Sequence, residues 1–516
     1  MPGRATPRAG RGSEFGLGRL RTPAPKSGEL QREPPAPPSQ GNRAMPPARQ
    51  MFHAQEETMT FAKRMIRLRR SLGHVFAFGA LAILLLGATA SAQAPGGDGR
   101  QATPDLREAI VDSVTATLNE SYVFEDVALD MEERLRSRLE AGDYDEHDTV
   151  AGFARALAQD LRDVSGDRHL GLRYMSDDMM AEFMDDEDDP ELERQREHDR
   201  LVKENFYFRK AEILEGNVGY LRFDQFPRAS LAGPTATAAV NFVAHTDALV
   251  IDLRHNGGGS PSLIQYIMAY LLDEPTHLNS FHTRQGDSIQ QFWSAPYVPG
   301  PTMEDVDLYV LTSSNTFSGA EEFTYNVKNL ERGTIVGETT GGGAHPLSFK
   351  VFPSLNVGLA VPYARAVNPV SGTNWEGTGI TPDIEVPAVD ALERAYLEAL
   401  TAILEDKDDE EERFSIQWVI DGLETKLEPV EVSESKLDSY AGQYGPRRLW
   451  VDGGQLLYQR EDGPVMAAMP MSQTLFRFEG LDYFRLEVVT DGSGVPVKLV
   501  GHYESGHMDE SARTDE

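Results

Sequence analysis

A short apolar run, followed by a polar turn and a helical pattern, constrains this chain more than any other stretch. The run Leu308–Leu311 has the length and composition of a buried strand, and residues 312–317 are polar and turn-like. From Gly319 onward, apolar residues recur at three- and four-residue steps, as they do on one face of a helix. Ser318 therefore lies where a strand, a turn and a helix meet.

A serine at such a junction has two interpretations. Its hydroxyl can accept a hydrogen bond from an N–H of the first helical turn, as capping serines commonly do. It can also act as a nucleophile, because the turn exposes the hydroxyl and the free N–H groups nearby can hold an oxyanion. Position alone favours the cap, so other parts of the chain must decide.

The first residues have the pattern of a leader rather than of a folded domain. Residues 1–58 are rich in Pro, Gly and Arg, and we expect them to be disordered or not translated at all. Residues 59–92 predict a signal peptide, with basic residues, the apolar run Val75–Ala90 and the cleavage motif Ala90-Ser91-Ala92. This run is short for a membrane span. We therefore expect export to the periplasm or the extracellular space, with no stable membrane insertion after cleavage.

Composition excludes several kinds of site and partner. The chain contains no cysteine, which excludes disulfides and thiolate zinc sites. Its 82 acidic residues outnumber 49 basic ones, and the formal net charge is −33. Such a chain repels nucleic acids and anionic membrane surfaces. We therefore expect no nucleic acid partner.

Beyond the leader, the pattern predicts three domains. Residues 104–200 carry apolar residues mainly at four-residue steps and predict a helical domain. Residues 206–395 alternate strand-like and helical runs, which predicts an α/β core with parallel strands. The acidic run 405–412 is interpreted as a linker. Residues 430–510 contain short alternating strands between Asp/Gly turns and predict a small antiparallel β domain with a scaffold or docking role.

Other segments of the core could assist a nucleophile. The glycine-rich turn Gly257–Gly259 follows a predicted strand and leaves backbone N–H groups unshielded. A nucleophilic serine also needs a base, and His169, His255 and His345 all lie in turns that contain glycine. Glu376 lies in another turn and could orient a base. Taken singly, each of these residues is more often structural or solvated than catalytic.

Together, five segments resemble the C-terminal (tail-specific) processing serine peptidases. The likeness is greatest to the branch that contains the tricorn protease core and the interphotoreceptor retinoid-binding protein repeats. In order, the segments are SGDRHL (165–170), ALVIDLRHNGGG (248–259), TSSNTFSGAEEF (312–323), TIVGETTGGGAHP (334–346) and EGTGITPDIEV (376–386). The resemblance covers residues 104–390 and implies a serine peptidase with a crotonase-like core that acts on polypeptides. Residues 430–510 resemble, more weakly, the lipocalin-like modules of secreted hydrolases.

The resemblance implies a role for individual residues. Ser318 matches the nucleophile, and Gly319 and Gly257 match the donors of the oxyanion hole. His169 matches the base, and Glu376 matches the acidic member of the site. The resemblance implies no cofactor and no metal ion.

Two positions depart from the family pattern. The lysine base of the tail-specific branch is replaced by Gly343, so a Ser–Lys dyad is not available. The serine that orients the histidine in the tricorn-like branch is replaced by Arg168, which leaves the orientation of His169 open. His345 is then the alternative base. A histidine base has a reference pKa of ~6.5, so we expect kcat/KM to rise with pH through roughly pH 6–7.5.

Two classes of function follow. One is an exported serine endopeptidase that forms an acyl-enzyme on Ser318. The other is a non-catalytic binding protein for apolar ligands or peptides on the same fold, as in the retinoid-binding relatives. The presence of Ser318, His169 and Glu376 favours the peptidase. The cleavage preference and the oligomeric state stay open.

Overall fold

The computed structural model describes residues 99–188 and 190–514, so the predicted leader 1–58 and signal peptide 59–92 lie outside the described residues. Within the described ranges, no helix combines the length and the apolar character that crossing a membrane requires.

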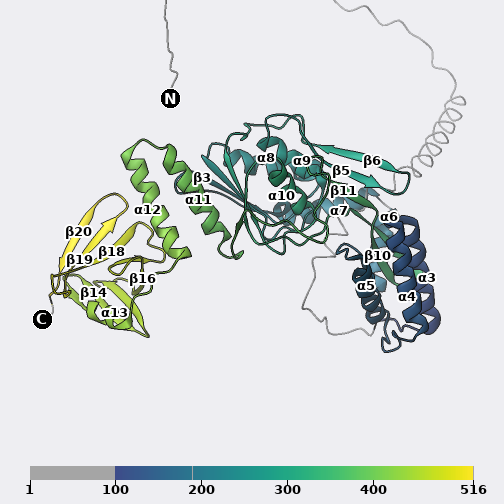
Figure 1. Cartoon of the computed structure of the whole chain (residues 1–516), viewed down its shortest axis with the longest axis horizontal. Helices are drawn as coiled ribbons and strands as arrows, with labels where there is room; N and C mark the ends of the chain where they lie inside the picture. The colour runs from purple at the N-terminus through teal and green to yellow at the C-terminus, as the bar shows by residue number, and fades with distance from the viewer. Residues whose placement is uncertain (1–98, 189, 515–516) are drawn as a thin grey trace, which may run out of the picture. The chain divides into compact units, whose positions relative to one another are not determined.

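Three helices form the first packed unit, as the apolar pattern predicts. They are α3 (Pro104–Ser121), α4 (Glu125–Glu140) and α5 (Val150–Ser165), and Figure 1 shows them side by side. Their apolar faces share one buried core. Helix α5 ends at Gly166, whose φ of 68° is left-handed and stops the helix. The chain then turns toward residues 167–169.

Two more helices and a single helical turn lead into the α/β core. They are α6 (Asp177–Asp188), α7 (Pro190–Lys203) and η1 (Asn205–Tyr207).

A six-stranded sheet forms the centre of the α/β core. Its order is β12-β8-β7-β4-β3-β2. The strands are β2 (Phe208–Leu214), β3 (Val218–Phe223), β4 (Ala248–Asp252), β7 (Asp307–Thr312), β8 (Thr334–Gly337) and β12 (Ile384–Glu385). All neighbours are parallel except the edge strand β2. The predicted α/β core with parallel strands is confirmed.

Helices cover both faces of this sheet. One face packs on α8 (Ala229–Phe242), α9 (Pro261–Leu271) and α10 (Gly319–Asn329). The other packs on α11 (Ala391–Asp406) and α12 (Glu410–Leu427). Because side chains alternate along a strand, Leu249 and Ile251 of β4 face the first group, and Ala248 and Val250 face the second.

Helices α11 and α12 together take up most of the acidic run 405–412, which the sequence predicted to be a linker. Acidic residues near a helix N-terminus stabilise it, because free N–H groups and the helix dipole favour negative charge there. The Asp409 side chain accepts hydrogen bonds from the N–H groups of Glu411 and Glu412, both at 3.0 Å. The acidic run therefore spans the end of α11 and the start of α12, and only residues 407–409 connect the two helices.

A second, smaller sheet joins the N-terminal helices to the core. Its order is β1-β10-β9, with β1 (Gly171–Tyr174), β9 (Leu347–Phe352) and β10 (Val357–Pro362), and the turn η2 (Pro353–Leu355) precedes β10. Side chains of β10 complete the buried core of α3–α5, and Figure 1 shows β10 beside these helices. This pairing brings residues 167–169, just before β1, toward residues 340–346, just before β9.

A third sheet was not predicted from the sequence. Its order is β11-β5-β6, with β5 (His277–Thr283), β6 (Ser288–Trp293) and β11 (Ala364–Val367). The sequence of this sheet lacks the alternation of apolar and polar residues that predicts a strand. Strand β6 is mostly exposed, and β5 carries polar residues on both faces.

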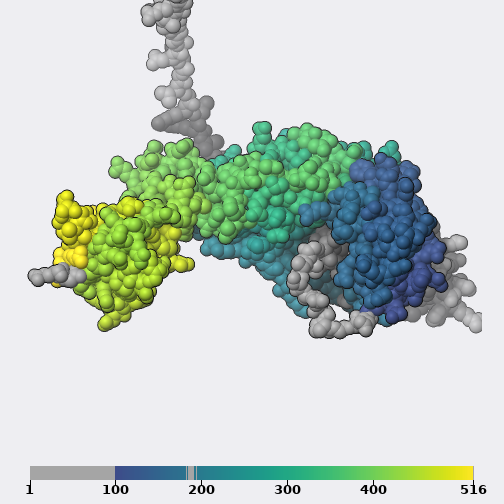
Figure 2. All heavy atoms as spheres, turned by 60° about the horizontal axis from the view of Figure 1, so that its bottom comes forward, coloured from purple at the N-terminus to yellow at the C-terminus, as the bar shows by residue number. Residues whose placement is uncertain are grey.

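The C-terminal segment forms the antiparallel β unit that the sequence predicts. Helix α13 (Glu434–Tyr440) precedes eight strands in sequential order: β13 (Gly442–Tyr444), β14 (Arg447–Asp452), β15 (Gln455–Arg460), β16 (Met466–Pro470), β17 (Leu475–Phe478), β18 (Phe484–Thr490), β19 (Pro496–Tyr503) and β20 (Met508–Ala512). A bridge between Tyr444 and Arg513 links the two end strands. In Figure 2 the yellow-green and yellow atoms of this unit form one body.

Candidate active site

Ser318 occupies the turn between β7 and α10, where the sequence places it. Its φ of 54° is positive, which is uncommon for a residue other than glycine. Such backbone costs about 1–3 kcal/mol and persists mainly at functional sites. An ordinary N-cap residue has extended backbone instead. The conformation of Ser318 therefore differs from that of a simple cap.

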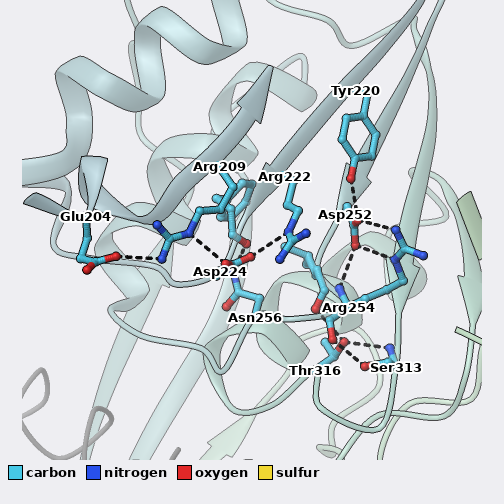
Figure 3. Close-up of polar contacts among 12 residues, drawn as sticks. Glu204, Arg209, Tyr220, Arg222, Asp224, Asp252, Arg254, Asn256, Ser313 and Thr316 are labelled. Carbon is cyan, nitrogen blue, oxygen red and sulfur yellow. Dashed lines mark hydrogen bonds and ion pairs between the residues drawn. The ribbon is translucent and has the colours of Figure 1, made fainter. Parts of the chain in front are cut away.

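Hydrogen bonds hold the Ser318 turn against the glycine-rich loop that follows β4 (Figure 3). The Ser313 hydroxyl donates to the Arg254 carbonyl at 2.6 Å, and the Thr316 hydroxyl donates to the Leu253 carbonyl at 2.8 Å. Two segments that are about 60 residues apart in sequence are thus joined directly before Ser318.

Asp252 anchors the other side of this loop (Figure 3). Its carboxylate accepts from Arg254 Nη2 at 2.7 Å and from the Tyr220 hydroxyl at 2.7 Å. Burial alone would raise the pKa of Asp252, but the hydrogen bonds and charge of Arg254 outweigh it and hold that pKa below its usual value. The start of the loop is therefore fixed to the end of β4 by a charge pair whose carboxylate is buried.

Glycines allow the two segments to touch. A Cβ on Gly258 would lie 2.6 Å from the Gly319 nitrogen, and a Cβ on Gly319 would lie 2.9 Å from the Gly259 nitrogen. Both approaches are closer than a side chain permits. The N–H groups of Gly319 and Gly259 consequently belong to neighbouring backbone segments beside Ser318.

The structure favours Gly259 over the predicted Gly257 as the second oxyanion donor. The Gly257 N–H donates to the Asp224 carbonyl at 3.3 Å, so it is already engaged. Across residues 99–188 and 190–514, neither the Gly259 N–H nor the Gly319 N–H has an acceptor. The sequence could not separate these glycines, because the path of the loop decides which amide is free.

Glu321 fixes the start of α10 to the glycine-rich turn 340–343. Its buried carboxylate accepts from the N–H groups of Ser318 (2.8 Å), Gly342 (2.6 Å) and Gly343 (2.9 Å). The Thr340 hydroxyl also donates to it, at 2.5 Å. Burial raises the pKa of Glu321, and these hydrogen bonds oppose that rise. Sequence analysis did not assign any role to Glu321.

His169 lies against the turn that contains Ser318. Its ring centroid is 4.7 Å from that of Phe317, and its side chain is buried. A Cβ on Gly343 would lie 2.3 Å from Phe317 Cζ and 2.7 Å from His169 Cε1. Two rings therefore fill the space that a side chain at position 343 would occupy.

Backbone and ring contacts, rather than a hydroxyl, orient His169. The backbone N–H of His169 donates to Asp167 Oδ1 at 2.9 Å. The buried ring nitrogen Nδ1 of His169 has no partner among the described residues. The Arg168 side chain donates to the Gly341 carbonyl and lies over the Phe317 ring at 5.9 Å. Burial lowers the pKa of His169 to about 4, against the opposing effect of the Asp167 carboxylate.

Behind His169, three titratable side chains form a buried cluster. His345 Nδ1 lies 2.8 Å from Asp167 Oδ2 and 3.5 Å from Glu376 Oε2. Glu376 Oε2 also accepts from the N–H groups of Ala344 (2.6 Å) and His345 (3.1 Å). Burial and the charge of Asp167 raise the pKa of Glu376 to about 7. Glu376 therefore supports the His345 loop, and its recorded hydrogen bonds do not reach His169.

Asp167 was not predicted from the sequence as a site residue, although it precedes His169 by two residues in SGDRHL. The ligating atoms of Asp167, His345 and Glu376 lie within 4.8 Å of one another, so this group could hold a metal ion. The hydrogen bonds described above already account for the arrangement.

Residues from these segments line one cavity of about 630 Å³. Its lining includes Ser318, Gly319, Gly259, His169, His345 and Glu322. The predicted nucleophile and base thus share a cavity, Gly257 is not part of its lining, and Glu376 stands behind it.

Residues 217–386 match the model described as "Peptidase family S41", and residues 102–208 match the "N-terminal domain of Peptidase_S41 in eukaryotic IRBP". Together the matches cover more than half of the chain. The chain belongs to peptidase family S41. This S41 protein is accordingly a serine peptidase with a polypeptide substrate.

Several solved structures resemble this S41 peptidase at low sequence identity. The photosystem II D1 C-terminal processing protease is 16% identical over 55% of this chain and 93% of its own, with a TM-score of 0.36. A lipoprotein from Streptococcus agalactiae is 13% identical over 61% of this chain and 100% of its own, with a TM-score of 0.38. The tricorn protease is 13% identical over 58% of this chain and 37% of its own, with a TM-score of 0.39.

We expect Glu321→Gln to weaken the fold and the site together. An amide presents N–H groups to backbone donors, so hydrogen bonds to a charged acceptor are lost, at about 1.5–3 kcal/mol. The free energy of unfolding in urea measures this loss. The same change at exposed Glu108 is the control and should leave stability almost unchanged. Equal stability of the two variants would contradict a positioning role for Glu321.

Proposed function

We propose that this S41 peptidase is an exported endopeptidase that cleaves peptide bonds through an acyl-enzyme on Ser318. The observation that carries the proposal is the pair of acceptor-free N–H groups, Gly319 and Gly259, beside a serine with strained backbone. We assign the core to the crotonase-like fold, and the parallel sheet covered by helices supports this assignment.

The proposed reaction begins with proton transfer from Ser318 Oγ to a neutral imidazole. Oγ then attacks the scissile carbonyl, and the N–H groups of Gly319 and Gly259 hold the resulting oxyanion. The imidazolium returns the proton to the leaving amine, and water releases the acyl group in a second round. Loss of one oxyanion donor typically costs ~2.7–4 kcal/mol of barrier.

His169 is our first candidate for the base. It lines the same cavity as Ser318, and burial keeps its imidazole neutral at physiological pH. Contact with the Phe317 ring supports the orientation of its imidazole, and the hydrogen bond from its backbone N–H to Asp167 fixes the main chain at this position.

One observation favours His345 as the second candidate. Its Nδ1 is paired with the Asp167 carboxylate at 2.8 Å, which is how a carboxylate usually orients a catalytic histidine. His345 also lines the cavity. The two histidines share Asp167, so only substitution of each in turn separates their roles.

We expect Ser318→Ala to abolish peptide hydrolysis and fluorophosphonate labelling, with little change in thermal stability. Alanine keeps the backbone but removes the nucleophile. Ser314→Ala, in the same turn at an exposed position, is the control and should retain both activities. If Ser318 were only a cap, the variant would lose ~0.5–2 kcal/mol of stability and keep its activity. A wild-type protein that resists the probe would favour the binding-protein alternative.

The pH dependence tests the base. A histidine base works only when neutral, so kcat/KM should fall as the pH drops through its pKa. Because burial lowers the pKa of His169 to about 4, we expect the acidic limb below pH 6 rather than at roughly pH 6–7.5, where an unperturbed histidine would place it.

His169→Ala should reduce kcat/KM by several orders of magnitude and remove this limb. His345→Ala should keep the limb even if the rate falls, because His345 supports the loop beside the cavity. The opposite result, with the limb lost only in His345→Ala, would assign the base to His345 and overturn our first choice.

We further propose export with cleavage after Ala92. The order of basic residues, the apolar run 75–90 and the small-residue motif supports this proposal. Mass spectrometry of the secreted protein should find Gln93 at the N-terminus. A mature chain that still contains residues 75–90 would instead indicate a membrane anchor.

A further inference from the structure

Glu322 has no part in the chemistry described so far, yet it lines the cavity that contains Ser318. It lies one turn into α10, and its N–H donates to the Ser318 carbonyl at 2.9 Å. The residue is only 4% exposed, so the cavity is where a partner can reach its carboxyl group.

The polar atoms around Glu322 are incompletely paired. Within the described residues, Glu322 Oε1 has no hydrogen-bond partner, and the same is true of Nδ2 of Asn279 on β5. Buried polar atoms are nearly always paired, so an unpaired acceptor in a cavity wall needs an explanation. Burial raises the pKa of Glu322 to about 7, and hydrogen bonding from the nearby Asn279 side chain opposes this rise, although no hydrogen bond of ordinary geometry joins the two side chains. A donor supplied by a ligand would satisfy the acceptor and favour its charged form.

The rest of the wall suits a long side chain with an apolar stem. The lining contains several aromatic and aliphatic residues alongside polar ones: Phe226, Phe281, Phe292, Leu347, Tyr363 and Trp375. Charged residues line the cavity as well. Arg228 is paired with Glu197, whereas Arg200 Nε is buried without a partner.

The spacing between Ser318 and Glu322 indicates which substrate residue Glu322 can contact. Residues four apart on a helix are roughly 6 Å apart along its axis. A lysine or arginine side chain spans a similar length, so a residue held at Ser318 can reach Glu322. The residue that supplies the scissile carbonyl is the one held there.

We propose that Glu322 determines specificity by binding the ammonium or guanidinium group of a lysine or arginine that supplies the scissile carbonyl. This inference rests on the proposed peptidase function. Lysine and arginine bury an apolar stem and present a charged donor, which matches the aromatic walls and the unpaired acceptor.

Fluorogenic peptides that differ only at this residue test the inference on the full chain. We expect kcat/KM to be about 10- to 100-fold higher for lysine or arginine than for norleucine, the range that a hydrogen bond to a charged group supplies. In Glu322→Gln the lysine-to-norleucine ratio should fall by about the same factor. Glu331→Gln, an exposed change after the same helix, should keep the wild-type ratio.

A second variant keeps the test decisive if Glu322→Gln does not fold. Glu322→Asp retains the charge but shortens the side chain, so the arginine-to-lysine ratio should rise. Equal wild-type kcat/KM values for the lysine and norleucine peptides would overturn the inference. A preference for glutamate would also overturn it and would indicate that Arg200 binds the substrate side chain instead.

Fluorophosphonate labelling separates failure of this inference from failure of the proposed function. If Ser318 is labelled and norleucine peptides are cleaved without a preference for lysine, only the role of Glu322 is wrong. If the probe does not label the chain and no peptide is cleaved, the proposed mechanism fails and the inference fails with it.

Discussion

The carboxylate of Glu321 is the contact on which the geometry of the site depends. It lies in the first turn of α10, where free N–H groups and the helix dipole favour negative charge. Its two oxygens accept from the Ser318 N–H and from two N–H groups of the turn 340–343. A carboxylate can do this because it offers about four acceptor sites and no donor. One buried side chain thus holds both Ser318 and the glycine-rich turn against which His169 packs.

Asp167 is the carboxylate that contacts both histidines of the candidate site. Its Oδ1 accepts a hydrogen bond from the backbone N–H of His169, and its Oδ2 is hydrogen-bonded to His345 Nδ1. The pairing of β1 with β10 makes these contacts possible, because it brings the end of the helical region to the loop before β9. The site is therefore assembled from the helical region and the α/β core, and neither contains all of it.

Local patterns were sufficient to predict the parallel core and the position of Ser318, because strand, turn and helix follow one another directly in the sequence. Features that depend on distant contacts were not predictable in this way. The partner of Asp167 lies 178 residues away, and the choice between Gly257 and Gly259 depends on the path of a loop. The start of α12 was missed for a different reason, since charge alone does not distinguish a helix cap from a linker.

The packing around Gly343 separates two ways of activating a serine. A side chain at this position would collide with the rings of Phe317 and His169. A lysine introduced at position 343 would therefore push the His169 ring out of its present place. Both rings must therefore move, or be replaced by smaller side chains, before position 343 can carry any side chain. Steric space thus couples three positions that lie far apart in the sequence: 169, 317 and 343.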